Sequence, residues 1–354
     1  MIVVIGGGVV GSWIALKLSE ICKDEIFLLE KEPSLWFHTS TRNSGVIHAG
    51  IYYDFHSFKR MFCIKGAEMS YEFFRDYNVE HVVSGKIIVG FNEQDRKMLK
   101  KLKERGEKNG VKGLTTLDKR GIKKVEPYCK AEFALYSPYT GVVNCSDYFR
   151  KMEALLQEKK VNIITNCKVI SVEKNIIKTT RGDLEFSTLI NAAGLWSDEI
   201  AVMSGITDYG IIPYKGDYFA LNDEKVSSMI YPVPGREGHL GIHLTKAAYN
   251  EIWIGPTSKK IDSKDDYNIL EKRDIFVKAC AALLEKFNEK KIVEGFSGLR
   301  AKCFKGDKML SDFHIFGFGN VIHLLGIDSP GLTAAPAIAE YVAKHLWFFQ
   351  KTSG

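Results

Sequence analysis

The sequence predicts an α/β protein whose parallel sheet begins at the first residues of the chain. Residues 1–5 form an apolar run typical of a fully buried strand, and glycines at 6–8 interrupt it. Residues 9–21 then place apolar side chains at helical spacing, and a second apolar strand follows at 25–29. A strand–helix–strand unit of this kind has a right-handed crossover, so we expect its two strands to be parallel.

Composition and charge restrict the class of protein. The chain has 354 residues, 26% of them charged, and a formal net charge of +6. This balance is typical of globular proteins, and the length predicts two domains. The positive surplus is small and spread along the chain, so we expect no nucleic-acid partner and mildly favour a small anionic substrate.

The cysteines and the chain ends predict a compartment. The chain has seven cysteines and no C-x-x-C pair, so we expect neither a disulfide framework nor a metal site. The first residues lack a leader pattern, and no apolar run approaches the roughly 18–20 residues that span a bilayer. We therefore expect a cytoplasmic protein. Residues 345–349 are a candidate for peripheral membrane contact, with a buried helix end as the alternative.

The middle of the chain predicts further elements in a mixed order. Residues 35–54 are rich in Ser, Thr, Gly and His and predict a long loop. Several β-rich segments between 208 and 259 predict an antiparallel sheet. The remaining expected elements are helices at 56–77, 93–108, 148–158, 266–288 and 332–349, and strands at 80–91, 162–165, 169–173, 184–191, 315–318 and 321–325.

The order of these elements predicts a discontinuous domain, because segments of the nucleotide-binding type lie at both ends of the chain. We expect residues 1–80, 140–205 and 290–354 to form a Rossmann-type cofactor domain. Residues 81–139 and 206–289 would then form an inserted α+β substrate domain built on an antiparallel sheet.

The glycine turn after the first strand predicts a dinucleotide site. Gly6, Gly8 and Gly11 have the G-x-G-x-x-G spacing between a strand and a helix, and Glu30 closes the next strand nineteen residues later. Gly6 permits the tight turn, Gly8 lets the backbone approach a pyrophosphate, and Gly11 permits close packing. The helix N-terminus favours the pyrophosphate, and Glu30 accepts from a ribose hydroxyl. The motif does not distinguish NAD from FAD.

The start of the last helix favours FAD. Residues 328–331 (Asp-Ser-Pro-Gly) precede a first turn without charge, so its dipole could face an anion such as the N1/O2 edge of reduced flavin. Ser329, Gly331, Leu332 and Thr333 are therefore candidate flavin contacts. A plain amphipathic helix is the alternative.

A polar loop at 39–50 and one arginine carry the candidate chemistry. The loop gathers hydroxyls, an amide, Arg42 and His48 between apolar elements. Arg300 stands among small and apolar residues, where an anionic substrate or an internal salt bridge would balance its charge. His243 and Lys215, in the β-rich region, are further candidates, although each alone is more typical of a structural or solvated residue.

The chain contains, in this order, GGGVVGSWIALKLS with FLLEKE, RNSGVIHAGIYY, EPYCKAEFALYSPYTGVVN, LINAAGLWSDEIA, YKGDYFAL, IYPVP and SPGLTAAPAI. These segments cover nearly the whole chain and resemble the glycine/D-amino-acid oxidase class of FAD-dependent oxidoreductases. Within that class they resemble L-2-hydroxyglutarate dehydrogenases and oxidases most, and α-glycerophosphate oxidases next. The ending SPGLTAAPAI is more similar to the second group.

The resemblance implies noncovalently bound FAD and a role for individual residues. His48 corresponds to the proposed catalytic base, and Arg300 occupies the G-x-R position near flavin and substrate. Arg42 departs from the hydroxyglutarate-type loop, which usually has a histidine or a small polar residue there. The implied substrate contacts also include Tyr53, His243 and Lys215. The implied cofactor contacts are Gly6, Gly8, Gly11, Glu30, Lys31, Thr39, Asn43, Ser44, Val169 and Gly194, with Ser329, Gly331, Leu332 and Thr333.

The reaction that the resemblance implies is oxidation of L-2-hydroxyglutarate. We expect His48 to remove the hydroxyl proton while hydride passes to flavin N5, and Arg300 with His243 or Lys215 to hold the anionic substrate. Oxidation of α-glycerophosphate, amine oxidation and a flavin-binding redox sensor are the alternatives. Oxygen, a quinone and a soluble carrier all remain open as electron acceptor.

Overall fold

The computed structural model describes residues 1–222, 226–235, 241–249 and 251–351, the last five by their backbone only. Its first sheet contains the predicted parallel strands and one antiparallel edge strand. Strands β1 and β2 are parallel neighbours, and β13, β22 and β9 continue the same direction. The six-stranded order is β21-β22-β13-β1-β2-β9. Its strands are β1 (Ile2–Ile5), β2 (Ile26–Leu29), β9 (Asn162–Ile164), β13 (Thr188–Asn191), β21 (His314–Phe318) and β22 (Val321–Leu325).

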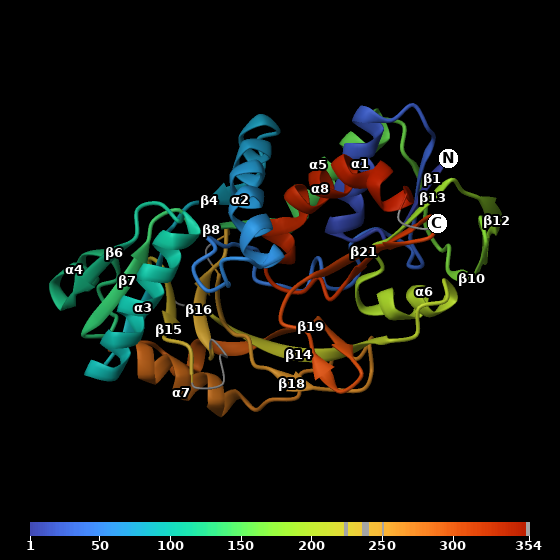
Figure 1. The fold of residues 1–354 in the computed structure, drawn as a ribbon. Coiled ribbons are helices and arrows are strands. Elements are labelled where there is room, and N and C mark those ends of the chain that lie inside the picture. The colour runs from blue at the N-terminus through green and yellow to red at the C-terminus, as the bar shows by residue number, and fades with distance from the viewer. Residues whose placement is uncertain (223–225, 236–240, 250, 352–354) are drawn as a thin grey trace.

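Four helices pack together beside this sheet and share one apolar core with it. In Figure 1, α1, α2, α5 and α8 lie together in the upper part of the molecule, above β14 and β19. Trp13, Phe62, Tyr148 and Ile338 are buried members of this core. The helices are α1 (Val9–Ile21), α2 (Phe58–Asp76), α5 (Cys145–Glu158) and α8 (Gly331–Lys351). Segments from both ends of the chain therefore contribute to one hydrophobic core.

The second large sheet has ten strands and crosses the lower part of Figure 1. Its centre is the long antiparallel ladder between β14 and β19. Most of its pairs are antiparallel, but β15 and β5 are parallel, so the sheet is mixed. Its strands are β5 (Lys86–Gly90), β6 (Thr115–Asp118), β7 (Phe133–Ser137), β14 (Tyr209–Leu221), β15 (Met229–Pro232), β16 (His243–Lys246), β17 (Ile252–Gly255), β18 (Lys259–Lys260), β19 (Ile292–Lys305) and β20 (Lys308–Met309).

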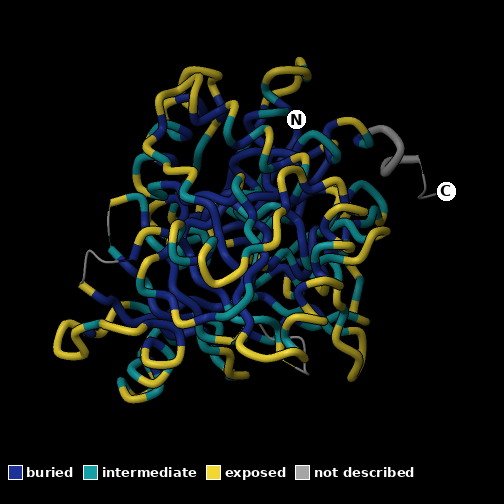
Figure 2. Tube along the Cα trace, turned by 90° about the vertical axis from the view of Figure 1, so that its left-hand side faces the viewer, coloured by how far each residue is buried: buried dark blue, intermediate teal, exposed yellow. Residues whose placement is uncertain are grey.

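The remaining elements are short or peripheral. In Figure 2 buried residues fill the middle of the molecule, and exposed ones lie mainly in the outer loops. Two small sheets complete the fold: β3 (Val46–Ile47), β4 (His81–Val82) and β8 (Gly141–Val143), then β10 (Val169–Glu173), β11 (Ile176–Thr179) and β12 (Gly182–Glu185). The other helices are α3 (Glu93–Asn109), α4 (Lys119–Val125), α6 (Ser197–Met203) and α7 (Arg273–Leu283), with the 3₁₀ turns η1 (Gly194–Trp196) and η2 (Glu289–Lys291).

Three predicted elements and one domain boundary differ from the structure. The strand predicted at 80–91 is two strands in different sheets, and the one predicted at 184–191 is also divided in two. The helix predicted at 266–288 covers only α7, because the preceding loop closes over buried charges on β14: Asp266 pairs with Lys215, and the Leu270 and Glu271 amides donate to Asp217. Strand β19 lies in the second sheet through its ladder with β14, although residues from 290 onward were assigned to the cofactor domain.

Candidate functional site

The glycine turn between β1 and α1 lines a cavity of about 130 Å³. A Cβ atom on Gly6, whose φ is +106°, would lie 2.4 Å from the carbonyl oxygen of Ala192. A Cβ atom on Gly11 would lie 2.0 Å from the carbonyl oxygen of Gly6. Side chains are therefore excluded at both positions. Gly6 and Gly8 line the cavity, whereas Gly11 acts by letting α1 pack closely on the turn.

Glu30 lies at the end of β2, in the wall of this smaller cavity. Its carboxylate accepts from the amide of Gly7 at 2.8 Å and from the amide of Glu32 at 2.9 Å. Burial raises the pKa of Glu30, and the two amide hydrogen bonds oppose that rise. The carboxylate is thus fixed beside the glycine turn, where a ribose hydroxyl would meet it. The other predicted contacts in this wall are Lys31, Thr39, Val169 and Gly194.

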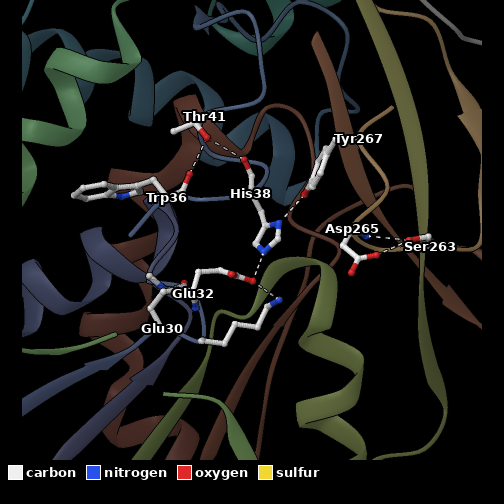
Figure 3. A network of polar contacts seen from close by, with 10 residues as sticks. Glu30, Glu32, Trp36, His38, Thr41, Ser263, Asp265 and Tyr267 are labelled. Atoms are coloured by element: carbon white, nitrogen blue, oxygen red, sulfur yellow. Dashed lines mark hydrogen bonds and ion pairs between the residues drawn. The ribbon is translucent and has the colours of Figure 1, made fainter. Parts of the chain in front are cut away.

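A polar network beside this cavity links the loop after β2 to the loop before α7 (Figure 3). His38 contacts the Glu32 carboxylate through Nε2 at 2.8 Å and the Tyr267 hydroxyl through Nδ1 at 2.7 Å. Because a carboxylate only accepts, Nε2 carries the proton and Nδ1 accepts from Tyr267. Burial lowers the pKa of His38, which agrees with a neutral ring. The Arg42 guanidinium lies 4.0 Å from the centre of the Tyr267 ring.

A larger cavity of about 1210 Å³ continues from the smaller one. Both are lined by Gly8, Thr39, Ser40, Ala192 and Gly194. The larger volume exceeds the roughly 300–1,000 Å³ of ordinary ligand pockets, so a large cofactor ring and a small substrate fit together. The predicted residues that line it are Arg42, Asn43, Ser44, His48, Tyr53, His243, Arg300, Ser329, Gly331 and Leu332.

The polar loop is held in shape by its own amide side chain. Asn43 donates to the carbonyls of Thr39 and Ser40 at 3.1 and 2.7 Å and accepts from the amide of Gly45 at 2.8 Å. A Cβ atom on Gly298 would lie 2.1 Å from the carbonyl oxygen of Arg42, so the loop contacts β19 directly. The loop is therefore rigid where it lines both cavities.

His48 is positioned by the start of α8. Its amide donates to the Thr333 hydroxyl at 3.1 Å, and that hydroxyl donates to the carbonyl of Val46 at 3.2 Å. Its ring Nε2 lies 3.4 Å from the Ser329 hydroxyl, and its buried Nδ1 has no partner among the described residues. Burial, assisted by the charge of Lys86 and by His243, lowers the pKa of His48 to about 3. The ring is therefore neutral at pH 7 and able to accept a proton.

His243 faces the same cavity from β16. Its Nδ1 lies 3.1 Å from the carbonyl oxygen of Gly241, which only accepts, so the proton is on Nδ1 and Nε2 has a free lone pair. Burial is the main reason that the pKa of His243 is lowered to about 3. A neutral ring with an accepting Nε2 suits a substrate hydroxyl, not a carboxylate. His243 therefore stays a predicted substrate contact, with the substrate hydroxyl as its expected partner.

Two arginines give the cavity its positive charge. Arg300, on β19, donates from Nη1 to the carbonyl of Thr257 at 3.2 Å, and within the described residues no carboxylate pairs with it. The Nε of Arg42 is buried and likewise has no hydrogen-bond partner in the described part of the chain. The internal salt bridge considered for Arg300 is thus absent there, and both guanidinium groups can receive an anion.

Asp328 fixes the turn that precedes α8. Its buried carboxylate pairs with Lys59 at 2.7 Å and with Lys302 at 2.5 Å. The two ammonium groups keep the pKa of Asp328 below its usual value although burial opposes this. Two cations against one carboxylate leave a positive excess beside the predicted flavin contacts Ser329 and Gly331, which line the same cavity.

Three predicted site residues, Gly11, Lys215 and Thr333, do not line either cavity. Lys215 is 1% exposed, and its ammonium pairs with Asp266 at 2.7 Å and donates to the carbonyl of Asn268 at 2.9 Å. Its charge is already balanced inside the protein, so the expected substrate contact is corrected. The hydroxyl of Thr333 is occupied by the His48 amide and the Val46 carbonyl, so this side chain positions the loop.

Sequence reasoning missed several residues of the larger cavity. The tyrosines Tyr52, Tyr218 and Tyr231 line it, as do Lys59, Lys302 and Asp328. Lys86 lies behind Tyr52 and Tyr231, with its ammonium 4.8 and 4.7 Å from their ring centres. The available signal was a lysine that opens the apolar run Lys86–Gly90, whose residues are all buried. Periodicity cannot show which ring such a lysine contacts.

Neither a metal site nor a membrane-crossing helix is found among the described residues. No group of His, Cys, Asp or Glu in that part of the chain could hold a metal ion. None of the helices there is long and apolar enough to cross a membrane. Of the candidate membrane contact at 345–349, Leu346 is buried in the first core, and the side chains of 347–349 lie outside the described residues.

The fold and the two connected cavities define a dinucleotide-binding oxidoreductase. The model of the FAD dependent oxidoreductase family matches residues 1–345, and the chain belongs to this family. Its cofactor is FAD. The residues fit that group: the side-chain-free turn at Gly6 and Gly8 and the fixed Glu30 carboxylate suit the adenosine and pyrophosphate parts, and the larger cavity has room for the flavin ring.

Relatives and solved structures cover nearly the whole chain. It is 32% identical to the mitochondrial L-2-hydroxyglutarate dehydrogenase of Nematostella vectensis, over 97% of this chain and 89% of that protein. It is 30% identical to the L-2-hydroxyglutarate dehydrogenase of Indibacter alkaliphilus, over 97% and 98%. The FAD-bound L-α-glycerophosphate oxidase of Mycoplasma pneumoniae superposes with a TM-score of 0.89 at 26% identity, over 98% and 94%. These findings confirm the predicted resemblance.

Proposed function

We propose that this protein oxidises the secondary alcohol L-2-hydroxyglutarate to 2-oxoglutarate. The observation that carries the proposal is the pairing, in one cavity, of a neutral buried imidazole with a guanidinium that has no carboxylate partner among the described residues. The relatives that bear the name L-2-hydroxyglutarate dehydrogenase support the choice of substrate. FAD, when bound, supplies the acceptor for the hydride that leaves the substrate carbon.

The chain's own residues bind the substrate and move its proton. In this proposal Arg300 holds the carboxylate next to the reacting carbon in its fork, which orients the C–H bond. His48 accepts the hydroxyl proton, and the free lone pair of His243 orients that hydroxyl before the proton leaves. The positive charge of Arg42 lies in the same wall and favours an anionic substrate.

The cofactor and the second sheet complete the proposal. We propose that FAD is bound noncovalently, since within the described residues no cysteine lines the larger cavity. The ten-stranded sheet, with β19 and β20 included, is the proposed substrate domain, because β14, β16 and β19 supply Tyr218, His243 and Arg300 to the cavity.

Oxidation of α-glycerophosphate is the second candidate. It is favoured by the likeness to the glycerophosphate oxidase structure and by the excess of cations around Asp328, which suits a phosphate. An amine-oxidising activity is disfavoured, because a cationic amine would meet Arg42 and Arg300 in the same cavity.

A turnover assay tests the proposal. The purified flavoprotein is supplied with each substrate and a dye acceptor, and the product is identified by mass spectrometry. We expect 2-oxoglutarate from L-2-hydroxyglutarate and little turnover of α-glycerophosphate or amino acids. Turnover of α-glycerophosphate alone would select the second candidate. Adding oxygen, a quinone analogue or a soluble carrier to the reduced protein then identifies the natural class of acceptor.

A further inference from the structure

Lys86 is a fully buried cation without a counter-charge in the described part of the chain. Its residue is 1% exposed at the start of β5. Its ammonium lies over the faces of Tyr52 and Tyr231 at 4.8 and 4.7 Å, and its charge also acts on the neutral rings of His48 and His243. Two aromatic faces replace little of the hydration that a buried ammonium loses, so an anion nearby would be strongly favoured.

The two tyrosines that hold this ammonium form a wall of the larger cavity. The Tyr52 hydroxyl is buried and has no hydrogen-bond partner among the described residues. On the other side, the Tyr231 ring stacks on His243 at 3.7 Å between ring centres. This wall of the cavity therefore combines the Tyr52 hydroxyl, which has no partner among the described residues, with the uncompensated charge of Lys86 behind it.

The site around Lys86 is separate from Arg300, the residue that holds the reacting end of the substrate in the proposed function. Arg300 lies on β19, at the register position of Tyr214, whereas Lys86 lies on β5, across the same sheet. Buried Lys215, in the same sheet, shows the contrast: its ammonium pairs with Asp266, and it does not line the cavity. Of these two buried lysines, Lys86 is thus the one whose charge a ligand can balance.

We propose that Lys86 selects substrates with a second anionic group, by supplying the counter-charge for that group through the wall formed by Tyr52 and Tyr231. The Tyr52 hydroxyl donates the hydrogen bond. This inference rests on the proposed function and extends it: the enzyme recognises a dianion, with one anionic group at Arg300 and the other near Lys86.

The test compares a dicarboxylate with its monocarboxylate counterpart. L-2-hydroxyglutarate and L-2-hydroxypentanoate have the same reacting end, and the second has a methyl group in place of the far carboxylate. For the wild-type holoenzyme we expect kcat/KM to favour the dicarboxylate by roughly 10²-fold. Lys86→Met should remove most of this preference, with kcat/KM for the dicarboxylate falling far more than kcat/KM for the monocarboxylate. Tyr52→Phe should reduce the preference by about tenfold.

Binding and stability give readouts that do not depend on turnover. Glutarate should bind the wild-type holoenzyme in titration calorimetry, and Lys86→Met should weaken that binding at least tenfold. Without ligand, the Met variant should unfold at the same or a higher temperature than wild type, because an uncompensated buried charge is removed. The matched control Lys215→Met breaks a paired charge, so it should lower the unfolding temperature and leave the substrate preference unchanged.

Each outcome decides between the two proposals. If wild type oxidises L-2-hydroxyglutarate but Lys86→Met keeps the preference for it, the role of Lys86 is wrong and the proposed function stands. If wild type oxidises only α-glycerophosphate and the Met variant loses that activity, Lys86 serves a phosphate and the proposed substrate is wrong. If Lys86→Met lowers the unfolding temperature and reduces kcat/KM equally for the dicarboxylate and the monocarboxylate, Lys86 has a structural role and the proposal is wrong.

Discussion

At the scale of single residues, the chemistry depends on a histidine kept neutral by its surroundings. His48 should be the base, so His48→Asn should keep FAD bound but slow its reduction by roughly 10²–10⁴-fold. His243→Asn is the matched control, because it removes an imidazole from the same cavity. We expect the control to raise KM more than it lowers the rate of reduction. Stopped-flow absorbance measures both, and a reversed pattern would make His243 the base.

The same surroundings predict an unusual pH profile. The pKa of His48 is lowered to about 3, so its basic form persists on acidification, whereas an ordinary histidine would lose activity below its usual pKa of about 6.5. Lys86 and His243 face this ring and neutral Ser329 contacts it, while Arg42, Arg300, Lys59, Lys302 and Asp328 line the same cavity. We expect kcat/KM to be flat between pH 5.5 and 7.

At alkaline pH, the dependence of kcat/KM on pH should reflect the titration of Lys86. Burial lowers its pKa to about 8, and the titratable groups around it are Tyr52, Tyr231, Cys63, His48 and His243. The ammonium is charged below that pH, so kcat/KM for a dianion should fall above it. Lys86→Met should have no such fall. An acid limb near pH 6.5 in wild type, or an unchanged alkaline limb in the variant, would contradict these assignments.

The sequence showed which residues line the site better than it showed which groups each of these residues contacts. His48, Arg42 and Arg300 were predicted from composition of the loop and from resemblance, and all three line one cavity. Lys215 and Lys86 look alike in the sequence, since each is a lysine in an apolar strand. Only the folded chain shows that Asp266 neutralises the first and that two tyrosine rings surround the second.

At the scale of elements, the start of α8 is fixed by one buried carboxylate. Asp328→Asn should lower the free energy of unfolding by about 3 kcal/mol, because Lys59 and Lys302 then lack a counter-charge. Glu340 is the matched control on the surface of the same helix, where it also lies between two lysines, Lys65 and Lys344. Glu340→Gln should cost at most about 1 kcal/mol.

Urea unfolding at several pH values checks the cause of this difference. The pKa of Asp328 is below its usual value in the folded protein, so its stabilisation is present above the unfolded pKa of about 4 and is lost on further acidification. The gap between wild type and Asp328→Asn should therefore close below that pH. A gap that persists in acid would mean that packing, and not the ion pairs, accounts for the loss.

The elements themselves were predicted with uneven success. Helices α1, α2 and α3 follow their apolar periodicity, and the structure confirms them. The helix expected at 266–288 is wrong for its first turns because backbone amides there bond to Asp217, a partner far away in the sequence. Such long-range contacts override local pattern, and a single sequence does not reveal them.

At the scale of the whole molecule, His38 and Tyr267 join the loop after β2 to the loop before α7. Tyr267→Phe keeps the aromatic ring that contacts Arg42 but removes the hydroxyl that donates a hydrogen bond to Nδ1 of His38. We expect a loss of about 1 kcal/mol, which corresponds to roughly fivefold weaker FAD binding. Tyr139, which is 58% exposed, provides the control Tyr139→Phe. Fluorescence titration of the apoprotein with FAD measures both, and equal affinities would show that the junction does not support the cofactor site.

The division of the chain into two domains stays a prediction from glycine spacing and element order. The first sheet contains strands from both chain ends, since β22 pairs with β13 and β13 with β1. The assignment of β19 failed because strand pairing over residues 209–221 and 292–305 is a long-range choice. The residues that line the site come both from segments next to the first sheet and from strands of the second sheet.

The central claim is that L-2-hydroxyglutarate reduces the bound flavin. The most direct measurement mixes the oxidised protein anaerobically with L-2-hydroxyglutarate, D-2-hydroxyglutarate or α-glycerophosphate and records the flavin absorbance. We predict rapid, complete bleaching by the L-hydroxy acid, with 2-oxoglutarate formed in equal amount, and slow or no bleaching by the other two. Bleaching by α-glycerophosphate alone, or by none of the three, would contradict the claim.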